Sequence, residues 1–233
     1  MKIGIIGAMD VEVSHLKEAM TITNTVTVAR QEYCEGKLGE MDVVVVQCGV
    51  GKVRAAMCAQ VLCDLFHVTH VLNTGVAGSL NNDINIGDIV ISTNAIFYDV
   101  NATNFGYALG EVPSLGKVCF EADESLRELA KEAVKTVAPE VGVYDGRIAT
   151  GDQFICEAEK KNWIRDNFHA ECCEMEGAAI AEAAYLNDIP FIIIRAISDK
   201  ADEETVVSYD EFEGKAAVHC AKIVEYMISN MHA

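Results

Sequence analysis

Runs of apolar, often β-branched residues alternate along the chain with segments in which apolar residues recur at helical spacing. Uninterrupted apolar runs at 43–46 and 191–194 are typical of strands that are buried on both faces. Strands are expected at residues 3–6, 21–29, 31–38, 42–47, 68–72, 87–92, 147–150, 171–173 and 191–197. Helices are expected at residues 11–20, 52–66, 124–137, 157–167, 178–186 and about 209–231. Because helices alternate with strands and can cover both faces of a sheet, the pattern predicts an α/β fold: a three-layer α/β/α sandwich with a mixed, largely parallel central sheet.

Nothing in the sequence divides the chain into separate parts. Only three prolines occur, and there is no Gly/Ser/Pro-rich linker, low-complexity tract or internal repeat. We therefore expect one domain over residues 1–233.

The charge balance restricts the partners. With 18 Lys and Arg against 36 Asp and Glu, the formal charge is −18, and no run of basic residues offsets it. Nucleic acid and anionic membrane surfaces would be repelled, whereas small neutral or cationic ligands stay possible. The apolar start of the chain is too short for a signal peptide, and no apolar run approaches the ~18–20 residues of a membrane span.

The nine cysteines are odd in number and scattered, and neither C-x-x-C nor H-x-x-x-H occurs. Their pattern favours reduced, buried thiols in a cytoplasmic protein, with no metal site and no cofactor.

Candidate chemistry lies just after the predicted strands, because ligands of such sheets bind at the carboxyl ends of the strands. The segments to consider are 7–12, 49–52, 73–79, 151–155, 173–177 and 196–200.

The glycine-bearing segments do not complete a nucleotide motif. Residues 4–7 lack G-x-G-x-x-G, and the following helix starts with Asp10 and Glu12, which would repel a phosphate. We predict that Asp10 caps this helix and that Glu12 is either a solvated first-turn residue or a site residue. Lys52 ends a truncated phosphate loop, but Val53 follows it where Ser or Thr is required. Residues 73–79 are expected to form a loop, either a tight turn or a place where backbone approaches a sugar or base.

The acidic residues of the later segments suggest acid–base chemistry. Glu174 and Glu176 stand at the head of an Ala-rich helix, where glutamates usually compensate the helix dipole. Asp199 ends the most apolar strand; it could cap the next segment, but burial there would also raise its pKa and favour a protonated acid. Carboxyl groups held in different environments around one crevice, with Arg195 nearby, can carry out acid and base steps at neutral pH.

At the level of whole motifs, the chain closely resembles the bacterial 5′-methylthioadenosine/S-adenosylhomocysteine nucleosidases. The resemblance runs in order over essentially the whole chain, and its motifs are specific as a set. They are Lys2-Ile3-Gly4-Ile5-Ile6-Gly7-Ala8-Met9 with Glu12, Gly49-Val50-Gly51-Lys52-Val53, Asn73-Thr74-Gly75-Val76-Ala77-Gly78, Phe105-Gly106-Tyr107, Gly151-Asp152-Gln153-Phe154-Ile155, Glu174-Met175-Glu176 and Arg195-Ala196-Ile197-Ser198-Asp199.

This resemblance implies hydrolysis of the N-glycosidic bond of adenine thioribosides, without a metal or cofactor, by a homodimer. Asp199 would protonate the purine at N7, with Ser198 orienting it, and Glu12 would deprotonate the attacking water near Arg195. Glu176 would bind the ribose hydroxyls. The other implied contacts are Met175 on the sugar, Phe154 and the Ile155 backbone on adenine, Ala77 and Gly78 in the substrate site, Met9, Val50 and Tyr209 around the 5′-alkylthio group, and Phe105, Tyr107 and Pro113 lent by a second subunit.

Two alternatives stay open: a phosphorolytic purine nucleoside phosphorylase, and a non-catalytic nucleoside-binding protein on the same fold. A carboxylate at Glu12 would repel phosphate as a nucleophile, which disfavours the first. Some positions depart from the family pattern: Tyr98 and Asn101 in the subunit-contact segment, Val76, Tyr209, and Lys200, whose ammonium group we expect to face solvent.

Overall fold

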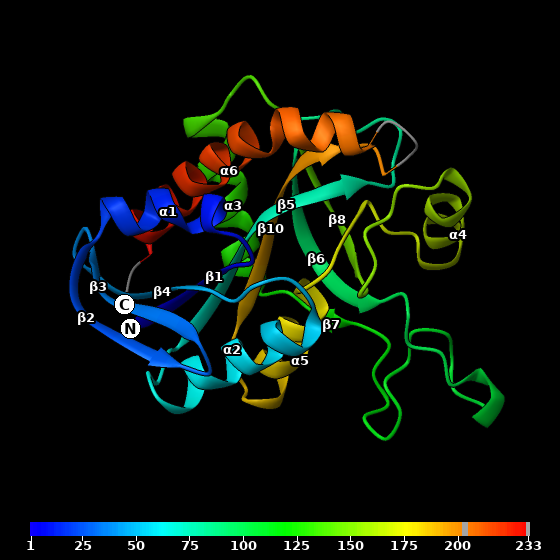
Figure 1. Ribbon diagram of the computed structural model, residues 1–233, viewed down its shortest axis with the longest axis horizontal. Helices are drawn as coiled ribbons and strands as arrows, with labels where there is room; N and C mark the ends of the chain where they lie inside the picture. Colours follow the sequence, from blue (N-terminus) through cyan, green and yellow to red (C-terminus); the bar gives the residue numbers. More distant parts are fainter. Residues whose placement is uncertain (202–204, 232–233) are drawn as a thin grey trace.

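The computed structural model describes residues 1–201 and 205–231, with only the backbone of 205–211, 213 and 215. Its strands and helices follow each other nearly as predicted (Figure 1). The strands are β1 (Lys2–Gly7), β2 (Thr21–Val28), β3 (Gln31–Leu38), β4 (Met41–Gln47), β5 (His70–Ser79), β6 (Ile89–Phe97), β7 (Phe120–Glu121), β8 (Val143–Thr150), β9 (Cys172–Glu174) and β10 (Phe191–Asp199). The helices are α1 (Asp10–Ala19), α2 (Lys52–Asp64), α3 (Glu124–Val137), α4 (Ala158–Phe168), α5 (Gly177–Leu186) and α6 (Thr205–Asn230), with a 3₁₀ turn η1 (Thr103–Phe105).

The strands form one mixed sheet. β1 lies between β4 and β5 and is parallel to both. The strand order β10-β6-β8-β9-β5 returns to β10, because β5 also pairs with β10, so this half of the sheet closes on itself while β4, β3 and β2 extend outward. Among the described residues, five strand pairs are parallel, and these join the central strands.

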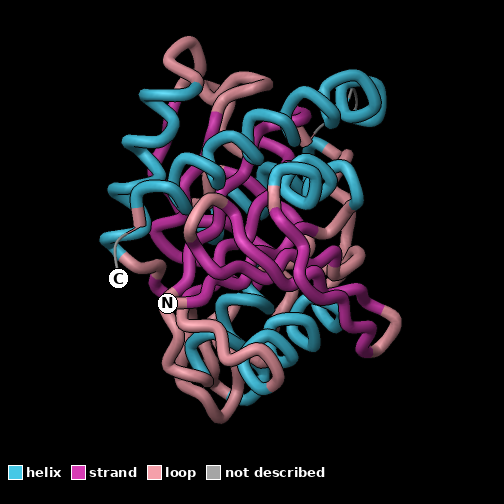
Figure 2. Tube along the Cα trace, turned by 90° about the vertical axis from the view of Figure 1, so that its left-hand side faces the viewer, coloured by secondary structure: helices cyan, strands magenta, loops and turns pink. Residues whose placement is uncertain are grey.

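Helices cover both faces of the sheet, which confirms the predicted layers. On one face α6 packs against both α1 and α3, and on the other face α2 packs against α5 (Figure 1, Figure 2). β4 shows why its apolar run is uninterrupted: Val43 and Val45 enter the core under α1 and α6, whereas Val44 and Val46 enter the core under α2 and α5. Each such side chain contributes roughly 1.5–3 kcal/mol by leaving water.

Two expectations about boundaries were wrong. β5 continues through residues 73–79, which we expected to form a loop. β6 runs to Phe97 rather than ending at residue 92, and the two-residue strand β7 pairs with its extension. Both extensions continue a ladder with neighbouring strands, and this tertiary pairing overrides local turn preferences.

Residues 98–118 leave the body of the protein between β6 and β7 and carry η1 at their far end (Figure 1). Phe105 in this segment is 84% exposed, which is unusual for a phenylalanine. We call residues 98–118 the excursion.

Candidate active site

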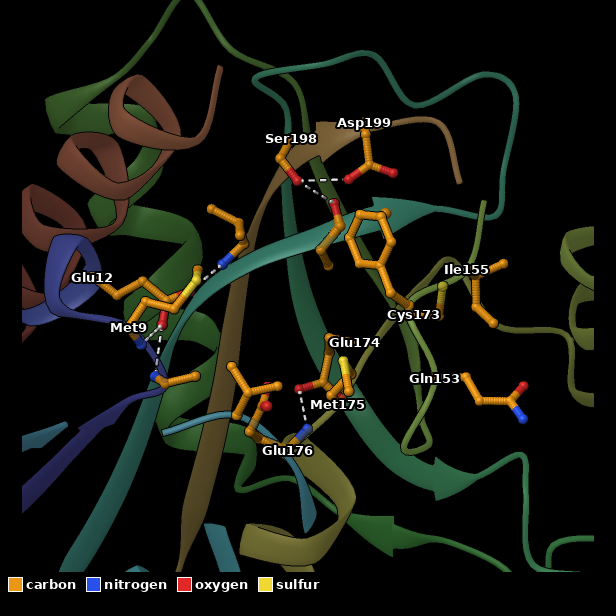
Figure 3. A pocket seen from close by; sticks show the side chains of 16 residues that line it. Met9, Glu12, Gln153, Ile155, Cys173, Glu174, Met175, Glu176, Ser198 and Asp199 are labelled. Atoms are coloured by element: carbon orange, nitrogen blue, oxygen red, sulfur yellow. Dashed lines mark hydrogen bonds between the residues drawn. The ribbon is translucent and has the colours of Figure 1, made fainter. Parts of the chain in front are cut away.

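One pocket of about 650 Å³ opens where β1, β5, β9 and β10 end (Figure 3). Its position agrees with the rule that ligands of such sheets bind at the carboxyl ends of strands. It is lined by Ala8, Met9, Glu12, Val50, Val76, Ala77, Gly78, Gln153, Phe154, Ile155, Cys173, Glu174, Met175, Glu176, Ser198 and Asp199.

Glu12 stands in the first turn of α1 with its carboxylate turned back onto the preceding chain. One oxygen accepts hydrogen bonds from the backbone N–H of Ala8 (2.6 Å) and of Met9 (3.0 Å), and the other accepts one from the N–H of Val76 on β5 (3.0 Å). Burial raises the pKa of Glu12, against the opposing effects of the Arg195 charge and of these N–H donors. The prediction that Asp10 caps α1 was wrong: Asp10 is the first helical residue and is exposed, and it is the Glu12 side chain that accepts a hydrogen bond from the N–H of the cap residue Met9.

Arg195 lies behind the pocket wall on β10 and is 2% exposed. Its Nη2 donates to Glu174 Oε2 and to Asn73 Oδ1, both at 2.6 Å. Burial by itself lowers the pKa of the guanidinium, but the negative charges of Glu174 and Glu12 raise it above its ordinary value. Arg195 therefore supplies a fixed positive charge among buried acids.

Glu174 was not among the predicted site residues, yet it is the most heavily bonded carboxylate here. Besides Arg195, its Oε2 accepts from the N–H of Glu176 (3.1 Å) and of Gly177 (2.7 Å). Its Oε1 accepts from Thr150 Oγ1 at 2.5 Å, and that hydroxyl accepts from the N–H of Ala178 at 2.8 Å. Glu174 thus caps α5 and holds Arg195 at once, and only the position of a glutamate at the join of strand and helix signals this in the sequence.

Glu176 stands two residues after Glu174, and its side chain reaches the turn before α2. Its Oε1 accepts a hydrogen bond from the N–H of Gly51 at 2.8 Å. Burial, together with the charge of Glu174, raises the pKa of Glu176 to about 8. At neutral pH the raised pKa favours the protonated form of Glu176.

Asp199 ends β10 on another side of the pocket from Glu12 (Figure 3) and is 2% exposed. Its Oδ2 accepts from Ser198 Oγ at 2.8 Å, and its Oδ1 accepts from the N–H of Ala201 at 2.8 Å. Ser198 Oγ also lies 3.4 Å from the carbonyl oxygen of Ala77. Asp199 is therefore held in place at the end of β10 by a side chain and by backbone that are different from those around Glu12.

The glycines of β5 explain why this strand resembles a loop in sequence. A Cβ atom on Gly75 would overlap the carboxyl group of Glu12, and one on Gly78 would lie 2.8 Å from Asp199 Oδ1. Neither residue has a positive φ. These glycines therefore make room for two carboxyl groups rather than turn the chain.

The chain beyond Asp199 is tied to two neighbouring segments. Lys161 on α4, although 5% exposed, donates from Nζ to the carbonyl oxygen of Lys200 at 2.6 Å. The ammonium of Lys200 donates to the carbonyl oxygens of Asn82 (3.2 Å) and Ile84. Lys200 does not simply face solvent as we expected: it is half-buried, and backbone carbonyls hold its ammonium group.

The remaining predicted residues divide into two groups. Phe154 and Ile155 line one wall beside Gln153 and Cys173, which sequence reasoning missed, and Met9 and Val50 line another. Met175, Ala77 and Gly78 also line the pocket. The side chain of Tyr209 lies outside the described residues. Phe105, Tyr107 and Pro113 lie on the excursion and do not line this chain's pocket.

The two departures in the excursion have local partners. The Tyr98 hydroxyl donates to the carbonyl oxygen of Gln153 at 3.2 Å, and Asn101 Oδ1 accepts from the N–H and hydroxyl of Thr103. Tyr98 and Asn101 therefore each form hydrogen bonds with residues close to them in the structure.

Within residues 1–201 and 205–231, no group of three or more His, Cys, Asp or Glu has the arrangement to hold a metal ion. No helix in this part of the chain is long and apolar enough to cross a membrane.

Comparison with known proteins places the pocket in context. Residues 2–229 match the phosphorylase superfamily. The chain is 40% identical over 232 residues to a 5′-methylthioadenosine/S-adenosylhomocysteine nucleosidase of Shewanella denitrificans, covering 99% of this chain and 100% of that protein. Its structure superimposes with a TM-score of 0.95 and 38% identity on the Neisseria meningitidis nucleosidase bound to methylthio-immucillin-A, covering 99% of each chain. The futalosine hydrolase of Helicobacter pylori also matches, with a TM-score of 0.93 and 32% identity over 99% of this chain and 98% of that one.

Proposed function

Since the chain belongs to the 5′-methylthioadenosine/S-adenosylhomocysteine nucleosidases of the phosphorylase superfamily, we propose that its pocket hydrolyses the N-glycosidic bond of these two nucleosides and releases adenine. The observation that carries the mechanism is the separation of its carboxyl groups: Asp199 stands on one side of the pocket beside Ser198 and Ala201, whereas Glu12 stands on another side with Arg195 and two further glutamates. Such a separation suits a reaction that needs an acid at the base and negative charge at the sugar.

The leaving group requires the acid. Adenine departs poorly as an anion, so Asp199 donates its proton to the purine nitrogen N7 as the C1′–N9 bond breaks. The electron pair of that bond stays on adenine, and the sugar becomes oxocarbenium-like. Ser198 keeps the Asp199 carboxyl group turned into the pocket by its 2.8 Å hydrogen bond.

The positive charge that develops on the sugar is stabilised by carboxyl groups on the other side of the pocket, Glu12 and Glu176. Glu12 holds the attacking water and takes one of its protons as the new C1′–O bond forms, and Glu176 accepts hydrogen bonds from the ribose hydroxyls. Burial strengthens both electrostatic effects because little water is left to screen them. Arg195 is within electrostatic reach of Glu12 and keeps part of that cluster ionised.

The rest of the pocket suits an adenine thioriboside. Phe154 stacks on adenine, the backbone of Ile155 reads the base edge, and Met175 lies against the sugar. Met9 and Val50 supply apolar contacts for a 5′-alkylthio group, together with Tyr209.

One experiment separates hydrolysis from phosphorolysis. Purified protein is incubated with methylthioadenosine, with and without phosphate, and free adenine and the sugar product are measured. We expect adenine and free thioribose at the same rate in both. A requirement for phosphate, with a ribose 1-phosphate product, would identify a phosphorylase, and tight nucleoside binding without turnover would identify a binding protein. Adenosylhomocysteine and futalosine in the same assay give the substrate preference.

We also propose a homodimer in which the excursion of one subunit completes the pocket of the other. Two observations support this: Phe105 is 84% exposed, and apolar side chains of Val50, Val53 and Met57 are exposed at and beside the pocket mouth. Phe105, Tyr107 and Pro113 would then cover the 5′ substituent of the partner's substrate. A protein that is fully active as a monomer in sedimentation experiments would contradict this assignment.

We also propose that the protein is located in the cytoplasm. All nine cysteines are free, as suits a reducing compartment. Cell fractionation with detection of the native chain tests it.

A further inference from the structure

The lysine of the truncated phosphate loop has no part in the proposed mechanism, yet its surroundings are highly organised. Lys52 begins α2 after a turn in which Gly49 and Gly51 have φ values of +78° and +102°. A lysine in the first turn opposes the helix dipole, so its presence there needs another cause. The cause is a pair of carboxylates: Nζ lies 2.7 Å from both oxygens of Asp99 and 3.8 Å from Asp152 Oδ2.

Backbone hydrogen bonds tie the same three residues together. The N–H of Lys52 donates to Asp152 Oδ1 at 2.9 Å, so Asp152 caps α2 from another part of the chain. The N–H of Asp152 in turn donates to Asp99 Oδ2 at 3.0 Å. We call Lys52, Asp99 and Asp152 the mouth triad. Its lysine is neutralised inside the protein, which leaves no free cation for a phosphate.

Each member of the mouth triad starts or adjoins a different wall of the pocket. The turn before Lys52 contains Val50 and also Gly51, whose N–H holds the Glu176 carboxyl group at 2.8 Å. Asp152 precedes Phe154 and Ile155 on the adenine wall. Asp99 is the second residue of the excursion, and next to it the ring of Tyr98 packs on Gly151, where a Cβ would overlap it.

We infer that Lys52 is a positioning residue for substrate binding, which holds the ribose-binding turn, the adenine wall and the root of the excursion in one arrangement. The inference rests on the proposed function for its substrate. Lys52 does not line the pocket, so its effect reaches the ligand only through Glu176, Phe154 and Ile155. Partly exposed ion pairs add little to global stability, and the side chains of Lys52 and Asp99 are 22% and 23% exposed. Removal of the lysine should therefore weaken binding more than folding.

The test compares three variants in a steady-state adenine-release assay. For Lys52→Met we expect KM to rise about tenfold, with kcat within about threefold of the wild type, because the walls are misplaced before chemistry begins. Lys52→Arg keeps a cation between the two aspartates and should restore KM to within about threefold. Lys37→Met is the matched control, because Lys37 pairs with Asp42 at 3.1 Å on the exposed surface, and it should leave both constants unchanged.

Two further measurements do not depend on turnover. The dissociation constant for adenine, measured by calorimetry, should weaken in Lys52→Met by about the same factor as KM. Amide hydrogen exchange should become faster at residues 51 and 152–155 in that variant, and not in Lys37→Met. If the wild type released no adenine from methylthioadenosine, the proposed function would fail, while these two readouts would still test the mouth triad.

Three results would overturn the inference. The first is an adenine dissociation constant and KM of Lys52→Met within twofold of the wild type. The second is a fall in kcat with KM unchanged. The third is a Lys52→Arg variant as impaired as Lys52→Met.

Discussion

The two sides of the pocket hold their carboxyl groups in different surroundings. On the sugar side, Glu12, Glu174 and Glu176 interact with one buried guanidinium and with several backbone N–H groups. On the base side, Asp199 is hydrogen-bonded by a hydroxyl and a backbone N–H. Figure 3 shows the two sides facing one another across the pocket.

This difference shows how one sheet edge can provide both an acid and a cluster of anions. The same strand, β5, borders both sides, with Gly75 against Glu12 and Gly78 against Asp199. The sugar side places three carboxyl groups around Arg195, whereas the base side presents Asp199 beside the Ser198 hydroxyl. Variants that act on one side and spare the other therefore test the proposed division of roles.

The largest expected effect belongs to Asp199→Asn. An amide cannot donate a proton to departing adenine, so kcat should fall by ~10²–10⁴-fold. Its oxygen can still accept from the N–H of Ala201, and its NH₂ can donate to Ser198 Oγ, so adenine affinity and the melting temperature should change little. Single-turnover kinetics, calorimetry with adenine and thermal unfolding measure the three quantities. A preserved kcat with lost affinity would contradict the acid role.

Glu12→Gln should reduce both hydrolysis and stability, unlike Asp199→Asn. It removes the base, so hydrolysis should also fall by ~10²-fold or more. In contrast to Asp199→Asn, it should destabilise the protein by ~1–3 kcal/mol, because three N–H groups point at the two oxygens and an amide NH₂ must face one of them. Urea unfolding of both variants in parallel makes the comparison, and equal stability of the two would show that the N–H cluster does not require a carboxylate.

Substitution of the two β5 glycines should displace the carboxyl group on each side of the pocket without removing it. In Gly75→Ala the new methyl displaces Glu12, and in Gly78→Ala it displaces Asp199, at an overpacking cost of ~1–3 kcal/mol each. We expect each variant to lose roughly ten- to a hundredfold in kcat/KM. Gly214→Ala on α6 is the control, because nothing lies within 4 Å of its Cβ position. Unchanged activity in either strand variant would mean that its carboxyl group has no fixed catalytic position.

The last expected effect is a pH dependence of stability rather than a loss of activity, and it belongs to the sugar side. The pKa of Glu176 is raised to about 8 in the folded protein, so the folded state binds more protons than the unfolded state from about pH 4.5 upward. The contribution of Glu176 to stability should therefore be fully present below about pH 4.5 and be lost as the pH rises to about 8, with a slope of at most about 1.4 kcal/mol per pH unit. Urea unfolding between pH 5 and 9 should show this slope, and Glu176→Gln should flatten it. A slope unchanged in the variant would assign the proton to another group.

Sequence patterns predicted most of the elements because each has its own local signal. The bounds predicted for residues 124–137 are those of α3, where apolar residues recur along one face and Asp123 caps the first turn at 2.9 Å. β4 and β10 were predicted from their apolar runs. The failures lie where a distant partner decides: Gly75 and Gly78 resemble turn residues until Glu12 and Asp199 occupy the space beside them.

The same limit applies to the site. Glu12, Glu176 and Asp199 stand at strand ends, and their acid–base character can be proposed from that position. For Glu174 the sequence predicts only the usual compensation of a helix dipole, because a glutamate at the start of a helix ordinarily needs no partner other than the helix itself. Its contact with Arg195, 21 positions later, depends on β9 and β10 lying near each other within the closed half of the sheet.

By itself, the sequence determined the alternation of strands and helices, the layered fold, the absence of basic surface runs and the positions where acidic groups could gather. These follow from periodicity and composition, which act through each residue's immediate neighbours. Tertiary structure alone decided which carboxyl groups gather around Arg195, which one stands across the pocket from them, and that Lys52 joins two aspartates. Ionisation and hydrogen bonding depend on distance in space and on burial, and neither quantity exists until the strands have paired.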